Sequence, residues 1–375
     1  MSQTIACKYL APYQDSSGYG SASRAFITSL HLANVDVTTE LTVHMKEKAH
    51  HGWEGELAYA LQNRDIPYKV KILHITPDLY QNYLEPKKYH IGRVAWETDR
   101  LPKGWERYLN TMGEVWTSSP QMIEIFKRSG VKIPMYYFPE PIDITTADKD
   151  WKKFGIVPPP GFIFYSVFQW IERKNPKALL RAYWKAFEGR EDVTLLLKVF
   201  RLSYDEDERR KIRNNIIEWK NQMGGRTLPR ILVCFEILSQ EQMMQFHATG
   251  DCFVSAHRGE GWGRPIQEAL LLGKPVIATS RGGIHEYLKP EHYFGIDSSM
   301  VPVTEVPYIK FYTQDQMWAE IDEAQLIKTM QYVFKNREKS GAKGVLAKEY
   351  CKENFSYHKI GEQMRMRLQE IYRNL

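Results

Sequence analysis

The sequence predicts an α/β protein made of two doubly wound domains in tandem. Short apolar runs alternate with amphipathic stretches along both halves of the chain, which is typical of parallel sheets covered by helices. A proline-rich stretch without periodicity begins near Pro139 and indicates a linker. Several later strands are apolar on both faces, as covered parallel strands are. We therefore expect domains at 1–150 and 151–354, followed by a terminal helix at 355–375.

Each element of the N-terminal half follows from its apolar pattern. Runs of alternating or continuous apolar residues predict strands at 4–10, 35–43, 69–75, 90–96 and 114–119. Helical periodicity predicts helices at 21–33, 54–63, 104–112 and 120–130.

The C-terminal half repeats this alternation and then becomes helical. Strands are expected at 161–170, 192–200, 230–238, 251–257 and 274–280. Helices are expected at 175–187, 205–223, 239–250, 264–273, 315–337, 340–354 and 356–375. Ligands of doubly wound sheets bind at the carboxyl ends of the strands, so we expect a small-molecule site at those ends, in a cleft between the domains.

Composition excludes several classes of protein. The 375 residues are 43% hydrophobic and 26% charged, which is typical of a globular protein. The sequence contains no run of 18 apolar residues, so no membrane span is expected, and the N-terminal residues do not resemble a secretory signal. The four cysteines are scattered, so neither a disulfide framework nor a zinc site is expected, and the cytoplasm is the expected location.

The charge of the chain is positive and concentrated near its end. The formal charge is +6, and residues from Lys335 onward carry ten Lys and Arg against five Glu. Such an excess suits phosphate-bearing ligands, nucleic acid or anionic headgroups at the inner face of a membrane. A solvated basic helix explains it equally well.

The most informative segment runs from Val254 to Leu288. A loop punctuated by three glycines separates a predicted strand from a helix that begins near Pro265, and such a turn offers backbone N–H groups to an anion. Glu260 lies in the loop and Glu268 lies on the helix, so both carboxylates can face one cleft and accept hydrogen bonds from vicinal hydroxyls. The pattern suits a sugar-nucleotide pocket. The alternative is an ordinary strand–turn–helix with two surface glutamates.

This segment resembles the glutamate-x7-glutamate motif of retaining family 4 glycosyltransferases, particularly through HRGEGWGRPIQEALLLGKPVIAT. WETDRLPKGW and FQWIERKNPKALLRAYWKAF resemble two further blocks of that family, in the same order. The resemblance implies the GT-B fold: two Rossmann-like domains, a donor site in the second and a final helix that returns to the first. It also implies a nucleotide-diphosphate sugar as donor substrate, with no cofactor and no metal.

Family roles can be transferred only to matching positions. Glu260 matches the glutamate that contacts the transferred sugar, Glu268 the one that holds the ribose, and Lys174 a cation that neutralises the donor diphosphate. Many relatives carry an arginine where this chain has Phe168 and Gln169. The candidates for the second positive charge are instead Arg173, Lys198 and Arg264. The donor-binding residues implied are Gly18, Gly20, Arg173, Lys198, Gly261, Trp262, Gly263, Arg264 and Glu268.

In the N-terminal half, the resemblance implies that the loop containing Gly18 and Gly20 closes over the donor phosphates. A plain tight turn is the alternative. His74, Glu97 and Asp99 are candidates for the acceptor side. His74 is equally well explained as a core histidine, and Asp99 as a helix cap.

The function expected is retaining, metal-independent transfer of a sugar to an acceptor hydroxyl of a surface glycan or lipid-linked saccharide. The first alternative is a phage-type transferase that modifies hydroxymethylated DNA bases, which the positive charge and 13% aromatic content favour. The second is a non-catalytic protein that binds sugar nucleotides, which the intact carboxylate pair disfavours.

Overall fold

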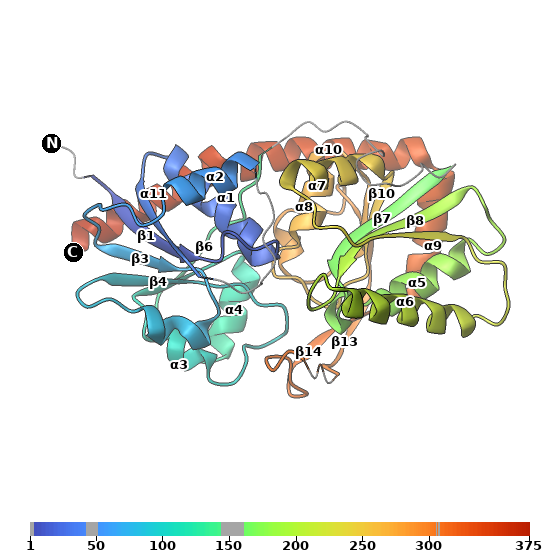
Figure 1. The fold of residues 1–375 in the computed structure, drawn as a ribbon, viewed down its shortest axis with the longest axis horizontal. Coiled ribbons are helices and arrows are strands. Elements are labelled where there is room, and N and C mark those ends of the chain that lie inside the picture. Colours follow the sequence, from blue (N-terminus) through green and yellow to red (C-terminus); the bar gives the residue numbers. More distant parts are fainter. Residues whose placement is uncertain (1–3, 43–51, 144–160, 305, 307) are drawn as a thin grey trace. The chain divides into compact units, whose positions relative to one another are not determined.

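The computed structural model describes residues 4–42, 52–143, 161–304, 306 and 308–375, and the chain divides into two compact units. Unit 1 is Met1–Asp143 with Lys352–Leu375, and unit 2 is Ile144–Cys351. Each unit contains a six-stranded parallel sheet with helices on both faces (Figure 1). The doubly wound α/β prediction is therefore confirmed. Most of the proposed linker, at 144–160, lies outside the described residues.

The sheet of unit 1 has the strand order β2-β1-β3-β4-β5-β6. Its strands are β1 (Ala6–Ala11), β2 (Asp36–Leu41), β3 (Val70–Leu73), β4 (Tyr89–Arg93), β5 (Glu114–Thr117) and β6 (Met135–Tyr137). The chain leaves β1 toward one side for β2 and returns to the other side for β3, so the topological switch point lies between β1 and β3. Ligands of such sheets bind there, at the carboxyl ends of the strands.

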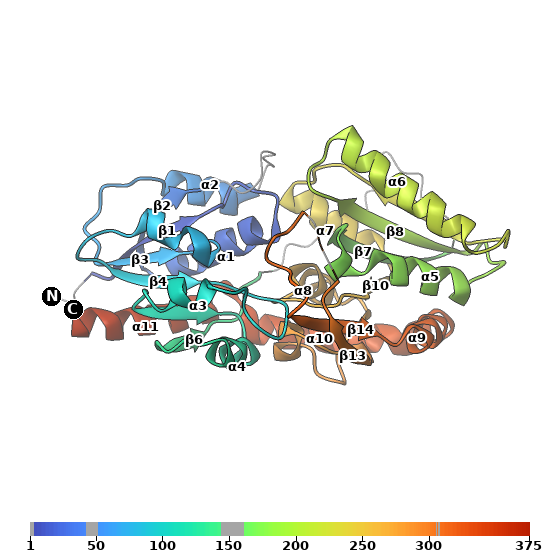
Figure 2. The same cartoon turned by 90° about the horizontal axis from the view of Figure 1, so that it is seen from below.

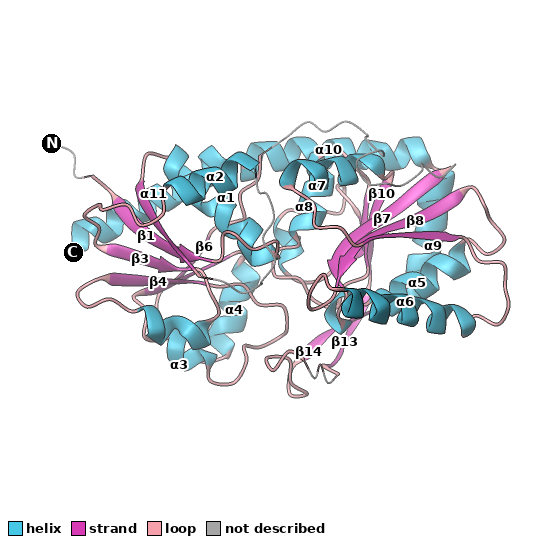
Figure 3. Ribbon diagram, viewed as in Figure 1, coloured by secondary structure: helices cyan, strands magenta, loops and turns pink. Residues whose placement is uncertain are grey.

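The helical segments of unit 1 are α1 (Gly18–Leu32), α2 (Gly52–Ala60), η1 (Pro77–Tyr83), α3 (Trp105–Leu109), α4 (Pro120–Arg128) and α11 (Tyr357–Asn374). Helices α1, α2 and α11 lie on one face of the sheet, and α3 and α4 lie on the other (Figure 3). Helix α11 packs closely on α1, since a Cβ added at Gly361 would meet the Ser29 carbonyl oxygen at 2.1 Å. The end of the chain therefore completes the core of unit 1.

The sheet of unit 2 has the order β12-β11-β10-β7-β8-β9, with its switch point between β10 and β7. Its strands are β7 (Phe162–Gln169), β8 (Val193–Phe200), β9 (Arg230–Cys234), β10 (Cys252–Ser255), β11 (Val276–Thr279) and β12 (Phe294–Ile296). Two further strands, β13 (Ser298–Pro302) and β14 (Met317–Ile321), pair antiparallel as a separate two-stranded sheet (Figure 2).

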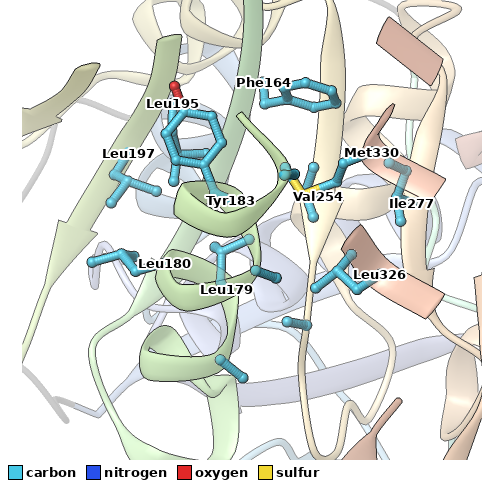
Figure 4. Packing of buried hydrophobic residues seen from close by; sticks show 14 of the residues in the cluster. Phe164, Leu179, Leu180, Tyr183, Leu195, Leu197, Val254, Ile277, Leu326 and Met330 are labelled. Atoms are coloured by element: carbon cyan, nitrogen blue, oxygen red, sulfur yellow. The ribbon is translucent and has the colours of Figure 1, made fainter. Parts of the chain in front are cut away.

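The helical segments of unit 2 are η3 (Glu172–Lys174), α5 (Pro176–Ala186), α6 (Glu206–Asn221), α7 (Gln240–Thr249), α8 (Arg264–Leu271), η4 (Gly283–Glu286), α9 (Glu323–Lys335) and α10 (Arg337–Phe355). Side chains of α5 and α9, including Leu180, Tyr183 and Met330, pack against strand residues such as Phe164 and Val254 (Figure 4). This buried apolar layer fixes the sheet whose edge carries the candidate site.

Two sequence predictions are wrong in detail. The helix expected at 315–337 begins only at Glu323, because Asp322 caps it and Met317–Ile321 forms β14, which pairs with β13. Gly18 and Gly20 lie within the first turn of α1 rather than in a loop before it. Ser17 caps that turn through its side-chain oxygen, which accepts from the Gly20 N–H at 3.1 Å.

Candidate functional site

The carboxyl ends of β7 and β10 place two loops of unit 2 side by side at the switch point. The loop after β7 contains Arg173 and Lys174, and the loop after β10 contains Glu260. The Arg258 N–H donates to the Arg173 carbonyl at 2.7 Å, which joins the two backbones directly. Residues 86 and 87 positions apart in the sequence therefore form one cluster.

Glu260 is the charged centre of this cluster. The Lys174 ammonium donates to its Oε1, and Arg173 Nη1 lies 3.4 Å from its Oε2. Only 7% of Glu260 is exposed. Burial alone would raise the pKa of Glu260, but the charges of Lys174 and Arg173 outweigh it and hold the pKa at about 2. The carboxylate is therefore ionised and acts as a hydrogen-bond acceptor at any physiological pH.

A second set of side chains holds the two loops in place. The guanidinium of Arg258 donates to the Glu172 carbonyl at 2.7 Å and binds Glu320 Oε2 at 2.6 and 2.9 Å. Asn175 donates to the other oxygen of Glu320 at 3.0 Å. Glu320 lies on β14, so the hairpin formed by β13 and β14 supports the loop that contains Lys174. Sequence analysis missed this support because β14 was expected to be helical.

The backbone of Glu260 is fixed by the loop after β11. The Gly283 N–H donates to the Glu260 carbonyl at 2.9 Å. Gly282 has φ +94°, and a Cβ there would meet the same oxygen at 2.7 Å. Only glycine suits this position, both for its backbone conformation and for the close approach.

The start of α8 follows directly. Gly263 is the N-cap at φ +82° and provides no side-chain cap, while Pro265 lies in the first turn. Trp262 is buried, and its indole N–H donates to Gln267 Oε1 at 2.8 Å. Tyr287 donates to the Trp262 and Gly263 carbonyls. Gly261 and Arg264 are also buried here, so this loop is a packed structure rather than a surface turn.

Glu268 lies on α8, as the sequence indicates, and it has a specific neighbour. His247 Nε2 is 3.1 Å from Glu268 Oε2, and His247 Nδ1 is 3.4 Å from the hydroxyl of Tyr165. His247 is fully buried on α7, whereas 15% of the Glu268 side chain is exposed. Sequence analysis did not identify His247, because a histidine within a helix belongs to no motif.

Lys198 lies on β8, near the carboxyl end of that strand. Its ammonium is 4.9 Å from the ring centroid of Tyr204 and 5.8 Å from that of Phe200, and 3% of the residue is exposed. Burial lowers the pKa of Lys198 to about 8. Of the three candidates for the second positive charge, Arg173 is therefore the one whose described contacts include Glu260.

His257 is a buried residue of the loop that also contains Glu260. Its Nδ1 is 3.0 Å from the Ser255 hydroxyl, and its Nε2 is 3.2 Å from the Arg281 carbonyl. Burial lowers the pKa of His257 to about 4, so the imidazole is neutral near pH 7. It joins the loops that follow β10 and β11.

In unit 1, His74 directly follows β3 at the switch point. Its Nδ1 is 2.9 Å from the Tyr9 hydroxyl and 3.3 Å from the Ser23 hydroxyl, and the rings of Tyr19 and Phe26 surround it. The histidine is buried. This position agrees with both interpretations offered by the sequence, because it is at once a packed histidine and a polar group at the edge of the sheet.

The other candidates in unit 1 differ in environment. Burial raises the pKa of Tyr19, whose ring lies against His74, and the charge of Glu97 adds to that shift. Asp99 pairs with Arg100 at 3.4 Å, and the N-cap of α3 is Gly104 rather than Asp99. Gly18 faces open space, since a Cβ there would meet nothing within 4 Å.

Within the described parts of the chain, no group of three or more His, Cys, Asp or Glu side chains is placed to hold a metal ion. In the same residues, no helix has both the length and the apolar character needed to cross a membrane.

Known structures resemble this protein over its whole length. HepE from Anabaena, solved with UDP and glucose, has a TM-score of 0.70 at 13% identity, covering 98% of this chain and 100% of that one. Sucrose-phosphate synthase from Thermosynechococcus elongatus has a TM-score of 0.69 at 15% identity, covering 99% and 100%. A glycosyltransferase from Rickettsia africae has a TM-score of 0.64 at 14% identity, covering both chains fully. The fold is therefore GT-B.

The sequence comparison is more local. The family model described as glycosyl transferases group 1 matches residues 150–299, the part of unit 2 that contains Glu260 and Glu268. No curated protein sequence matches the chain.

Proposed function

We propose that this protein is a retaining glycosyltransferase that moves a sugar from a nucleotide-diphosphate sugar to an acceptor hydroxyl. The observation that carries the proposal is the ionised Glu260 beside Lys174 and Arg173, within the segment that matches the group 1 model. A buried carboxylate that accepts hydrogen bonds, next to two cations, suits a nucleotide sugar, which has sugar hydroxyls on one side and a diphosphate on the other.

In this mechanism Glu260 accepts hydrogen bonds from the transferred sugar and orients it. Negative charge grows on the oxygen that bridges sugar and diphosphate as the bond breaks, and Lys174, Arg173 and loop N–H groups stabilise it. The acceptor hydroxyl attacks from the face that the diphosphate leaves, so the anomeric configuration is retained. The departing phosphate oxygen takes the proton of that hydroxyl.

Glu268 holds the ribose of the donor in this proposal, and no metal takes part. His74 and Glu97, at the carboxyl edge of unit 1, are the proposed acceptor-side residues. A saccharide acceptor, on a surface glycan or a lipid carrier, suits such hydroxyl and imidazole groups.

The experiment is a panel of UDP-, GDP- and ADP-sugars incubated with the purified protein, with release of each nucleoside diphosphate measured. We expect one nucleotide to be preferred and a chelator to leave turnover nearly unchanged. Proton NMR of the first transfer product should show the anomeric configuration of the donor. No release from any donor would overturn the proposal, and an inverted product would overturn its mechanism.

DNA as acceptor receives less support from the contacts of α11. Arg367 pairs with the buried carboxylate of Glu114 at 2.6 Å and lies over the Tyr136 ring, and Arg365 pairs with Glu362. Two of the basic residues that suggested nucleic acid are thus neutralised within unit 1. Sugar incorporation into hydroxymethylated DNA, together with DNA binding that weakens steeply with salt, would reverse this preference.

A further inference from the structure

The environment of Glu268 differs from that of Glu260 in one important respect. Glu260 is held by two cations, whereas the described contact of Glu268 is with an imidazole. An ionised carboxylate only accepts hydrogen bonds, so His247 Nε2 must carry the proton and donate to Glu268. The other ring nitrogen, Nδ1, lies 3.4 Å from the Tyr165 hydroxyl. The three side chains are therefore linked by hydrogen bonds, with His247 between Tyr165 and Glu268.

His247 cannot itself rotate away from this position. It has no exposed surface, and its ring stacks on Phe253 with centroids 5.9 Å apart and planes at 28°. The Tyr165 ring meets it edge-on, with centroids 5.5 Å apart. The partly exposed Glu268 carboxylate therefore has a rigid hydrogen-bond donor on its buried side.

We propose that His247 is a positioning residue that fixes the Glu268 carboxylate for recognition of the two ribose hydroxyls of the donor. This inference rests on the proposed function. Without the bond to His247, Glu268 keeps its charge but loses its defined orientation. Recognition of a vicinal diol depends on orientation, whereas attraction to the rest of the nucleotide does not.

The test is calorimetric binding of UDP, GDP and ADP to the full chain, followed by the 2′,3′-dideoxy form of whichever binds best. His247→Phe keeps a buried ring but removes the donor. We expect it to weaken binding of the ribonucleotide on the order of tenfold and to leave the dideoxy affinity nearly unchanged. His247→Gln, whose amide nitrogen can occupy the position of Nε2, should restore most of the loss.

Controls separate positioning from general damage to α7. Thr249→Val alters a buried neighbour whose hydroxyl bonds only within the helix, to the Gln245 carbonyl at 2.8 Å, and should bind like the wild type. Tyr165→Phe should weaken ribonucleotide binding less than His247→Phe does. In a Glu268→Gln background, His247→Phe should have no further effect.

The two proposals fail in distinguishable ways. If the wild type binds none of the three nucleotides, the proposed function falls and this inference falls with it. If the wild type binds but His247→Phe loses ribo and dideoxy affinity equally, or loses neither, only the role of His247 is overturned. Should His247→Phe fail to fold, the same comparison of ribonucleotide with dideoxynucleotide affinity is made for His247→Gln and Tyr165→Phe.

Discussion

The two units use the same kind of sheet, yet the described side chains at the carboxyl edges of those sheets differ in kind. At the edge of unit 2, Glu260 lies between Lys174 and Arg173, and all three are charged groups on loops. At the edge of unit 1, His74 is surrounded by hydroxyl groups and aromatic rings. The fold fixes where a ligand can bind, and the loop residues decide which ligand suits that place.

Unit 1 also contains a cation, but it is buried within the sheet. Arg93 ends β4, donates to the Ser118 hydroxyl at 2.8 Å and lies over the Phe26 ring. Burial lowers its pKa, while Glu140 opposes that shift. Because only 1% of Arg93 is exposed, its charge supports the fold rather than an incoming phosphate. Arg93 is therefore not expected to take part in ionic recognition of a diphosphate.

The largest effect should come from removing the charged centre. Glu260→Gln should lower sugar transfer a hundredfold or more, roughly 3 kcal/mol at the transition state, because the sugar loses its oriented acceptor. The matched control is Glu323→Gln, which removes a carboxylate of unit 2 that pairs with Arg181 and Lys185 on α5. Steady-state kinetics measure both. Transfer by Glu260→Gln at the wild-type rate would contradict the role given to the charged cluster of unit 2.

The second effect is a dependence of stability on pH from His257. The pKa is about 4 in the folded state against 6.5 for the free group, so the unfolded state binds more protons between those values. The free energy of unfolding should fall by up to about 1.4 kcal/mol per pH unit as the pH drops through this range. Denaturant titrations should show His257→Gln losing this slope. Parallel curves for the two proteins would refute it.

The third prediction contrasts two glycines of α1. A Cβ at Gly20 would meet the Asp15 carbonyl oxygen at 2.3 Å, whereas one at Gly18 would meet nothing within 4 Å. Gly20→Ala should therefore destabilise the protein by about 2 kcal/mol, and Gly18→Ala should be nearly neutral. Thermal unfolding distinguishes them. Equal loss in both variants would mean that close packing is not what requires glycine at position 20.

The smallest effect concerns Lys198. Its pKa of about 8 means that the folded state disfavours the charged form, so Lys198→Met should stabilise the protein by about 1 kcal/mol at pH 7. The wild type loses its proton more readily when folded, so the gain should vanish as the pH rises from 8 toward 10.5. If Lys198 also binds the donor, transfer should fall while stability rises. Unchanged transfer would show that Lys198 does not bind the donor.

The motif was the part of the site most accessible to sequence analysis. Glu260 and Glu268 lie in one loop and the helix after it, so their spacing alone predicts their local structure. The supports of these residues could not be predicted in this way. Glu320 reaches Arg258 from a hairpin 62 residues later, and His247 reaches Glu268 from another helix. Such contacts depend on how elements pack, and a single sequence does not record that.

By itself, the sequence determined the alternation of strands and helices, the repetition of that alternation and the position of the glutamate pair. These features follow from local periodicity, capping residues and glycines, which act over a few residues. Tertiary structure alone decided that Arg173 joins Lys174 at Glu260, that Lys198 lies against aromatic rings, and that Gly20 but not Gly18 is tightly packed. Burial and charge interact through space, so their consequences appear only when distant segments meet.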